Sequence, residues 1–316
     1  MTTPAAARRP LVSVVIPCFN QGHYLGEAIE SVLNQKYERV EIIVVNDGSS
    51  DDTTQIASSY PEVALIVQEN RGLSAARNRG LEQSRGELLV FLDADDRLLT
   101  GALSRGVACL AEHAECAFAF GQFHFIHAEG GFVRAVEREP RGQHAYLDLL
   151  RTNRIGMHAT VIYRRWVFDR IGAFNTALKA CEDLELYLRI ARRFPVVEHP
   201  ALVAEYRRHT ESMSSNGRKM LTSVLAVLEA ESRQVATDPE RQAALHEGIL
   251  RATGFYTIRL MRAALPPRIN RRNWRPALAD LWWLARSHPR GFLHARLWLP
   301  EIIERRKRYR RAYASA

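Results

Sequence analysis

Within its first 113 residues the chain alternates, four times, a short apolar run with a segment whose apolar residues recur at helical spacing. The apolar runs are nearly continuous, which is the pattern of strands buried on both faces. The alternation therefore predicts a parallel sheet with helices on both sides. The predicted strands are 12–17, 40–45, 63–68 and 87–92, and the predicted helices are 22–35, 53–59, 73–84 and 98–113.

Beyond residue 113 the periodicity is weaker, and from about residue 215 it changes to that of long amphipathic helices. We expect three parts: a disordered N-terminal segment (1–9), an α/β domain (10–215), and a helical, basic, Trp/Arg-rich C-terminal region (216–316). The later elements predicted are strands 118–126, 158–163 and 203–207, and helices 166–171, 182–194, 220–231 and 241–264.

The net charge of +9 belongs to the C-terminal region. Residues 1–216 hold 24 basic and 27 acidic side chains, whereas residues 217–316 hold 20 basic and 8 acidic ones. The sequence contains no recognised nucleic-acid-binding module, so we expect no nucleic-acid partner despite the basic balance.

Several protein classes are excluded by what the sequence lacks. No apolar run approaches the roughly 18–20 residues of a membrane span, and the first residues do not form a signal peptide. The four cysteines include no CxxC pair, so neither a zinc site nor a disulfide framework is indicated. A P-loop, a GxGxxG turn after the first strand and a GxSxG elbow are also missing. A reduced, cytoplasmic compartment fits best.

Polar residues gather where the predicted strands end, at 17–20, 46–52 and 93–96. Ligands of parallel sheets bind at the carboxyl ends of the strands, so these segments mark a candidate site. Asp93, Asp95 and Asp96 would repel one another unless a cation lies among them, and carboxylate oxygens suit Mg²⁺ or Mn²⁺. The alternative is a solvated acidic turn that caps the next helix.

Four motifs in order and spacing resemble the family 2 glycosyltransferases over residues 10–215: VVIPCFN at 14–20, VVNDGSSD at 44–51, NRGLSAARNRG at 70–80 and FLDADD at 91–96. The resemblance implies an α/β fold of the GT-A (Rossmann-like) type, a mostly parallel sheet flanked by helices, here with a C-terminal helical region. It also implies an inverting, metal-dependent enzyme of the hexosyltransferase type that uses a nucleotide-diphosphate sugar, a UDP-sugar being favoured.

The resemblance also implies roles for individual residues. Asp183 would be the general base with Glu182 beside it, although acidic residues there would also suit the start of a helix. A Mn²⁺ or Mg²⁺ cofactor would be bound by Asp95, Asp93 and His209; a structural role for His209 stays open. The nucleotide-binding residues would be Pro17, Phe19, Asn20, Asp47, Arg77, Asp93 and Ala94. For Arg77 the alternative is an ordinary surface arginine.

The acceptor implied is a hydroxyl of a glycan or of a lipid-linked molecule in bacterial cell-surface polysaccharide synthesis. Tryptophan interleaved with arginine after residue 266 suits an anionic membrane surface, such as the cytoplasmic face of the inner membrane. Packing of these helices on the catalytic domain is the alternative. Two other functions stay open: a nucleotide-sugar-binding regulatory or assembly protein without transfer activity, and a nucleotidyltransferase.

Overall fold

A computed structural model of the chain describes residues 9–135, 144–209, 212–263, 274–291 and 293. Most of the predicted N-terminal segment and the arginine-rich end of the chain therefore lie outside the described residues. Two compact units are present, one made of residues 1–146 with 154–210 and the other of residues 147–153 with 211–316. The sequence did not indicate that the segment 147–153 belongs with the second unit.

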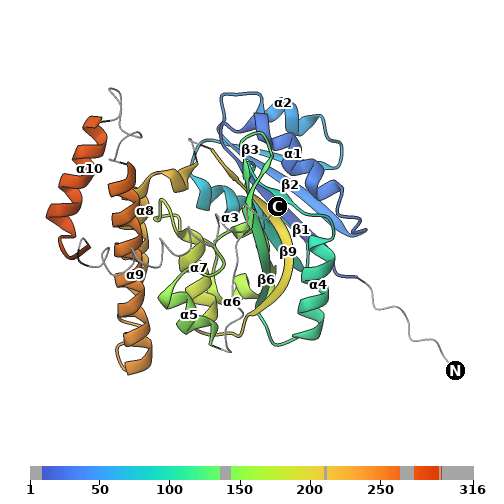
Figure 1. Ribbon diagram of the computed structural model, residues 1–316. Helices are drawn as coiled ribbons and strands as arrows, with labels where there is room; N and C mark the ends of the chain where they lie inside the picture. The colour runs from blue at the N-terminus through green and yellow to red at the C-terminus, as the bar shows by residue number, and fades with distance from the viewer. Residues whose placement is uncertain (1–8, 136–143, 210–211, 264–273, 292, 294–316) are drawn as a thin grey trace, which may run out of the picture. The chain divides into compact units, whose positions relative to one another are not determined.

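The first unit is built on a nine-stranded sheet in the order β3-β2-β1-β4-β8-β6-β9-β5, with β7 paired to β6 (Figure 1). The strands are β1 (Val12–Cys18), β2 (Val40–Asp47), β3 (Val63–Gln68), β4 (Leu88–Phe91), β5 (Arg97–Leu98), β6 (Phe118–His127), β7 (Phe132–Ala135), β8 (Val161–Arg164) and β9 (Val197–Arg208). The first four strands pair in parallel, as their continuous apolar runs predict. The mixed α/β fold agrees with the predicted class.

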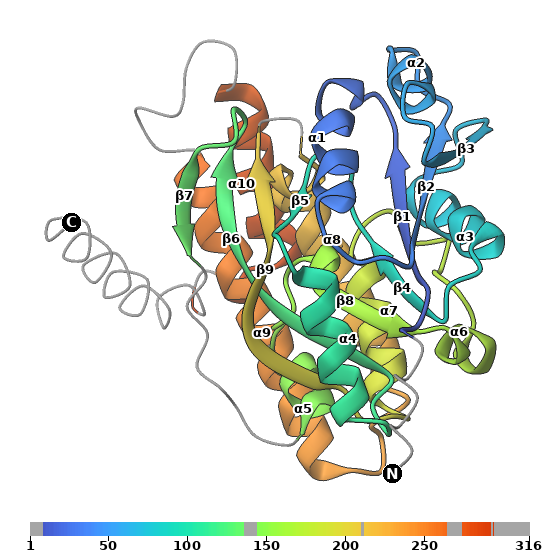
Figure 2. The same cartoon turned by 90° about the vertical axis from the view of Figure 1, so that its right-hand side faces the viewer.

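The order of the strands reverses at β1. The chain runs outward from β1 through β2 to β3, and β4 then returns to the opposite side of β1. Such a reversal leaves a crevice outside the carboxyl ends of the two central strands, because the loops after them diverge. Beyond β4, strand β8 pairs antiparallel with both β4 and β6, and β6 pairs parallel with β9 (Figure 2). At the edges, β7 pairs antiparallel with β6, and β5 pairs antiparallel with β9.

Helices of the first unit cover both faces of the sheet. Alternate residues of β1, among them Val14 and Ile16, share one apolar core with Leu25 of α1 and Leu103 of α4. On the other face α3 lies so close that a side chain at Gly80 would overlap Val15. The helices are α1 (Gly22–Leu33), α2 (Thr53–Ser58), α3 (Leu73–Gln83), α4 (Ala102–Glu112), α6 (Trp166–Ile171) and α7 (Glu182–Ala191).

Predicted and observed bounds differ at several elements, and for two of them tertiary pairing is the reason. The helix predicted from residue 98 begins at Ala102, because Arg97 and Leu98 pair with β9 as β5. The strand predicted at 203–207 extends back to Val197, since it pairs with β6 across two register shifts. At 158–163, a 3₁₀ turn (His158–Thr160) precedes β8.

The second unit is helical. Helices α8 (Gly217–Glu231), α9 (Pro239–Ala263) and α10 (Trp274–Ser287) share a core that includes Leu221, Leu260 and Leu284. Helix α5 (Ala145–Arg151) begins in the first unit and ends in the second, where Arg151 pairs with Glu247 of α9 at 3.2 Å. Among the described residues, no helix has the length and apolarity needed to cross a bilayer.

Candidate active site at the carboxyl ends of β1 and β4

The acidic segment Asp93–Asp96 forms a turn directly after β4, closed by a hydrogen bond from the Asp96 N–H to the Asp93 carbonyl. Asp96 is buried, and its carboxylate accepts the backbone N–H of Arg207 at 2.8 Å. Burial raises the pKa of Asp96 well above its usual range, and the charges of Asp95 and Asp93 add to the effect. The turn therefore concentrates negative charge where a cation would lower its energy.

Arg77 of α3 is buried and bridges the acidic turn to the start of α7. Its side chain is 2% exposed, and its two terminal nitrogens donate to Asp93 at 2.6 Å and to Glu182 at 2.7 Å. The guanidinium also lies over the ring of Phe174, 5.5 Å from the centroid. The structure therefore excludes the surface-arginine alternative and joins three predicted site residues, of which Glu182 lies 105 residues after Arg77 in the sequence.

Asp183 follows Glu182 in the first turn of α7. The residue before them, Cys181, has a φ of 60°, a conformation that costs a non-glycine residue energy and often occurs at functional sites. Burial raises the pKa of Asp183 to about 7, with the charge of Glu182 as the next cause. A carboxylate with a pKa near the working pH suits a general base.

Asp95 and His209 face each other, with the imidazole Nε2 2.9 Å from a carboxylate oxygen of Asp95. Adjacent ligands of an octahedral Mg²⁺ or Mn²⁺ stand about 3 Å apart at metal–ligand distances of about 2.1 Å. Both side chains are largely buried and come from different strand ends. The spacing of Asp95 and His209 thus fits two adjacent ligands of a divalent metal ion, whereas Asp93 on the same turn pairs with Arg77 at 2.6 Å. Among the described residues, the three predicted ligands do not form one group with their ligand atoms within 4.8 Å of one another.

The remaining predicted residues lie at the carboxyl ends of β1 and β2 and in the loop after β1, except Ala94, which lies on the acidic turn. Asp47 accepts the backbone N–H groups of Arg71 and Gly72 at 2.9 and 2.8 Å, and the side-chain amide of Gln68 at 2.7 Å. These bonds tie the end of β2 to the start of α3. One lone-pair site of Asp47 is left for a ligand.

Asn20 links the first two loops, since its side chain accepts the backbone N–H of Ser50 at 2.8 Å. Phe19 beside it is 48% exposed, whereas Pro17 and Ala94 are buried and can offer a ligand only backbone. No hydrogen bond between described residues joins Asp47 or Asn20 to the acidic turn. The structure therefore assembles Arg77, Asp93 and Glu182 directly, and leaves the nucleotide-side residues on neighbouring loops.

Sequence reasoning missed one residue of this site, Arg207, and gave no role to a second, His158. Arg207 contacts the acidic turn, and its position two residues before His209 was the available signal. His158 lies in an aromatic cluster with Phe91, Phe174 and Tyr187. Its burial, with the charge of Arg77, holds its pKa well below the usual range, so the imidazole is neutral. Periodicity gave no signal for it.

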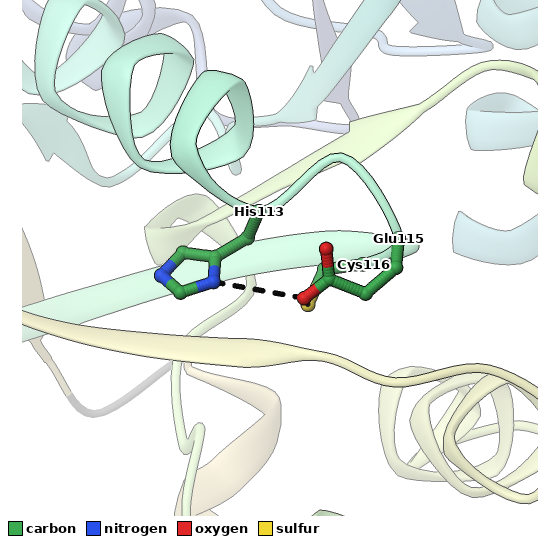
Figure 3. A group of neighbouring side chains, drawn as sticks. All are labelled: His113, Glu115 and Cys116. Atoms are coloured by element: carbon green, nitrogen blue, oxygen red, sulfur yellow. Dashed lines mark hydrogen bonds and ion pairs between the residues drawn. The ribbon is translucent and has the colours of Figure 1, made fainter.

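A second group of potential metal ligands, His113, Glu115 and Cys116, follows α4 (Figure 3). Their ligand atoms lie within 4.8 Å of one another. The Cys116 side chain belongs to the apolar core, and burial together with Glu115 raises the pKa of its thiol to about 11. At neutral pH the thiol therefore stays protonated, and a thiol is a poor metal ligand compared with a thiolate.

Comparison with known proteins places this arrangement in a family. The model of the family described as "Glycosyl transferase family 2" matches residues 13–172, about half of the chain. A putative teichuronic acid biosynthesis glycosyltransferase, TuaG of Bacillus subtilis, is 30% identical over 214 residues, which cover 66% of this chain and 83% of TuaG. An uncharacterized glycosyltransferase of Rickettsia felis is 30% identical over 220 residues, 65% of this chain but only 35% of that protein.

Solved structures share the fold at low sequence identity. TarS of S. aureus in complex with UDP-GlcNAc has a TM-score of 0.61 and 20% identity, covering 85% of this chain and 80% of TarS. The mannosyltransferase PcManGT of Pyrobaculum calidifontis, in complex with GDP-Man and Mn²⁺, has a TM-score of 0.60 and 20% identity, covering 93% and 85%. At this identity the likeness concerns the fold.

Proposed function

The chain belongs to glycosyl transferase family 2, and we propose that it transfers a sugar, with inversion, from a nucleotide-diphosphate sugar to an acceptor hydroxyl. The bridge that Arg77 makes between Asp93 and Glu182 carries the proposal, because it joins the acidic turn to the pair that contains Asp183. The donor would lie at the turn, and its anomeric carbon would face Asp183.

In this mechanism Asp183 takes the proton of the acceptor hydroxyl as its oxygen attacks the anomeric carbon. Asp47 would accept a hydrogen bond from the base of the nucleotide, with the exposed ring of Phe19 nearby on the neighbouring loop. Asp95, His209 and Asp93 would hold Mn²⁺ or Mg²⁺. When bound, that ion supplies charge neutralisation to the departing diphosphate. Arg77 keeps Asp93 and Glu182 in place during the transfer.

A UDP-sugar and a glycan or lipid-linked acceptor of the bacterial cell surface are the substrates we propose. The relative TuaG, named for teichuronic acid biosynthesis, supports the acceptor class. TarS in complex with UDP-GlcNAc supports a UDP-sugar, whereas PcManGT in complex with GDP-Man keeps GDP-sugars in the comparison. A panel of UDP-, GDP- and TDP-sugars, assayed for transfer with and without Mn²⁺ and with acceptors supplied, tests the proposal. Donor binding without turnover of any donor would favour the non-transferring alternative.

The proposed metal site makes a prediction about histidines. His209→Ala should weaken Mn²⁺ binding at least about tenfold, because the proposed ligand next to Asp95 is removed. His113→Ala is the matched control, since His113 belongs to the separate group after α4, and Mn²⁺ affinity should not change. The measurement is titration of free Mn²⁺ by electron paramagnetic resonance. A loss of Mn²⁺ affinity in His113→Ala but not in His209→Ala would contradict the prediction, because the ion would then be bound by the group after α4.

A second prediction concerns the second unit, which we propose contacts an anionic membrane surface. On α10, Trp282 is 65% exposed and Leu278, one turn earlier, is 50% exposed. Arg286 lies over the Trp282 ring, 5.6 Å from its centroid, so a cation accompanies the apolar patch. Trp283 is turned inward instead, where it packs against the core of the unit.

Replacement of both Leu278 and Trp282 by serine should lower recovery on floating anionic vesicles several-fold, because exposed apolar area and the ring on which Arg286 stacks are lost together. Phe255→Ser removes a similarly exposed aromatic ring from α9 and serves as the control, with recovery expected to stay at the wild-type level. Equal recovery of the double variant and the wild type would contradict the membrane role.

A further inference from the structure

Arg207 is fully buried next to the proposed metal ligands. It makes no hydrogen bond to the side-chain atoms of Asp93, Asp95 or His209 that would bind the ion. Its Nε donates to the Asp95 carbonyl at 2.8 Å, and its own backbone N–H donates to the Asp96 carboxylate at 2.8 Å. A further terminal nitrogen donates to the carbonyl of Ala128. The guanidinium thus contacts the acidic turn through its main chain, at the Asp95 carbonyl.

The ion pair of Arg207 is formed with a residue that is not a proposed metal ligand. Its other terminal nitrogen pairs with Glu27 of α1 at 2.6 Å, and Glu27 also pairs with Arg97 at 3.0 Å. Because its donors are engaged by Glu27 and by main-chain carbonyls, the Arg207 guanidinium makes no ion pair with the Asp95 carboxylate. The arrangement leaves that carboxylate to His209 and to an incoming ion.

Arg207 also reaches His209 through one aromatic ring. The guanidinium lies over the ring of Tyr24, 4.6 Å from its centroid, and the Tyr24 ring lies 5.3 Å from that of His209. The ring of Tyr24 therefore contacts both the guanidinium of Arg207 and the imidazole of His209. Tyr24 comes from the first turn of α1, so a separate element fixes the imidazole.

We propose that Arg207 is the positioning residue of the metal site, acting on Asp95 through the main chain and on His209 through Tyr24. The inference rests on the proposed function, since it concerns the ion proposed there. Supporting groups of this kind orient metal ligands, and their loss commonly weakens metal affinity about 10–100-fold. Lysine cannot replace the planar fork of donors that Arg207 uses.

The first test compares Arg207→Lys with Arg164→Lys. Arg164 of β8 is a matched control, because it also donates to main-chain carbonyls, those of Cys116 and Leu110, but far from the acidic turn. Both variants should lower the melting temperature. Only Arg207→Lys should weaken Mn²⁺ binding, by about 10–100-fold, when free Mn²⁺ is titrated by electron paramagnetic resonance. Equal Mn²⁺ affinities in the two variants would overturn the proposal.

The second test does not depend on the folding of a variant with a changed buried arginine. Tyr24→Leu keeps α1 apolar at that position and should weaken Mn²⁺ binding several-fold. In a His209→Ala background the same change should have less than about a twofold effect, because the coupling runs through His209. Additive effects would contradict the route through Tyr24. A wild type that binds no Mn²⁺ would contradict the metal site itself, whereas wild-type binding with unchanged variants contradicts only the role of Arg207.

Discussion

Replacement of Asp183 by asparagine is expected to lower kcat for sugar transfer by about 10²–10⁴-fold, the range that general base catalysis commonly supplies. Asparagine has nearly the same shape and cannot accept the acceptor's proton. The KM for the donor should change little, since no donor contact is lost. Initial rates of transfer at saturating donor measure the effect.

Glu185→Gln is the matched control for this variant. Glu185 lies in the same first turn of α7 but pairs with Arg189 at 2.8 Å and takes no part in the site. Its replacement should leave kcat unchanged. Wild-type transfer by Asp183→Asn would disprove the assignment of the base.

The pH dependence of transfer follows from the raised pKa of Asp183. A base must be ionised to act, so kcat/KM of the wild type should rise with pH and level off above about 7. The residual activity of Asp183→Asn should lack this rise. A wild-type profile that levels off near the ordinary pKa of a carboxyl group would contradict a base whose pKa is raised by burial.

Arg77→Met is the change with the largest expected effect on stability. It leaves Asp93 and Glu182 without the cation that holds both. Breaking a buried ion pair in this way costs about 3–5 kcal/mol of unfolding free energy. The free energy of unfolding is measured by urea unfolding at pH 7. Transfer activity should also fall, because the carboxylates of Asp93 and Glu182 are no longer held in place.

Arg77→Met has two controls, a variant of an exposed arginine on the same helix and the pH dependence of the loss of stability. Arg79 on the same helix forms an exposed pair with Glu82 at 3.3 Å, and Arg79→Ala should change the unfolding free energy by at most about 0.5 kcal/mol. In the Met variant, the Arg77 charge that lowers the pKa of Asp93 is gone, so burial raises that pKa further in the folded state. Stability tied to a raised carboxyl pKa is lost as the pH rises, so the deficit against wild type should shrink in acid. A deficit independent of pH would point to lost packing instead.

The alternating apolar runs were sufficient to predict β1 to β4 and the loops that carry the site, because strands buried on both faces leave a continuous pattern in the sequence. They could not predict β5 or the full length of β9. Arg97 and Leu98 form a strand only because Ala204 and Glu205 lie opposite them. Elements of two residues have no periodicity of their own.

The sequence by itself determined the chemical groups of the site and the edge of the sheet where they gather, since residue type and the position of strand ends are local properties. The roles given to Asp183, Asp95 and His209 stay predictions. Tertiary structure alone decided that Arg77 is buried between Asp93 and Glu182, and that Arg207 donates to the Asp95 carbonyl. Glu182 lies 105 residues after Arg77, and Arg207 lies 112 residues after Asp95. Partners so far apart leave no trace in a local pattern, because burial and ion pairing arise only when the sheet brings distant strand ends together.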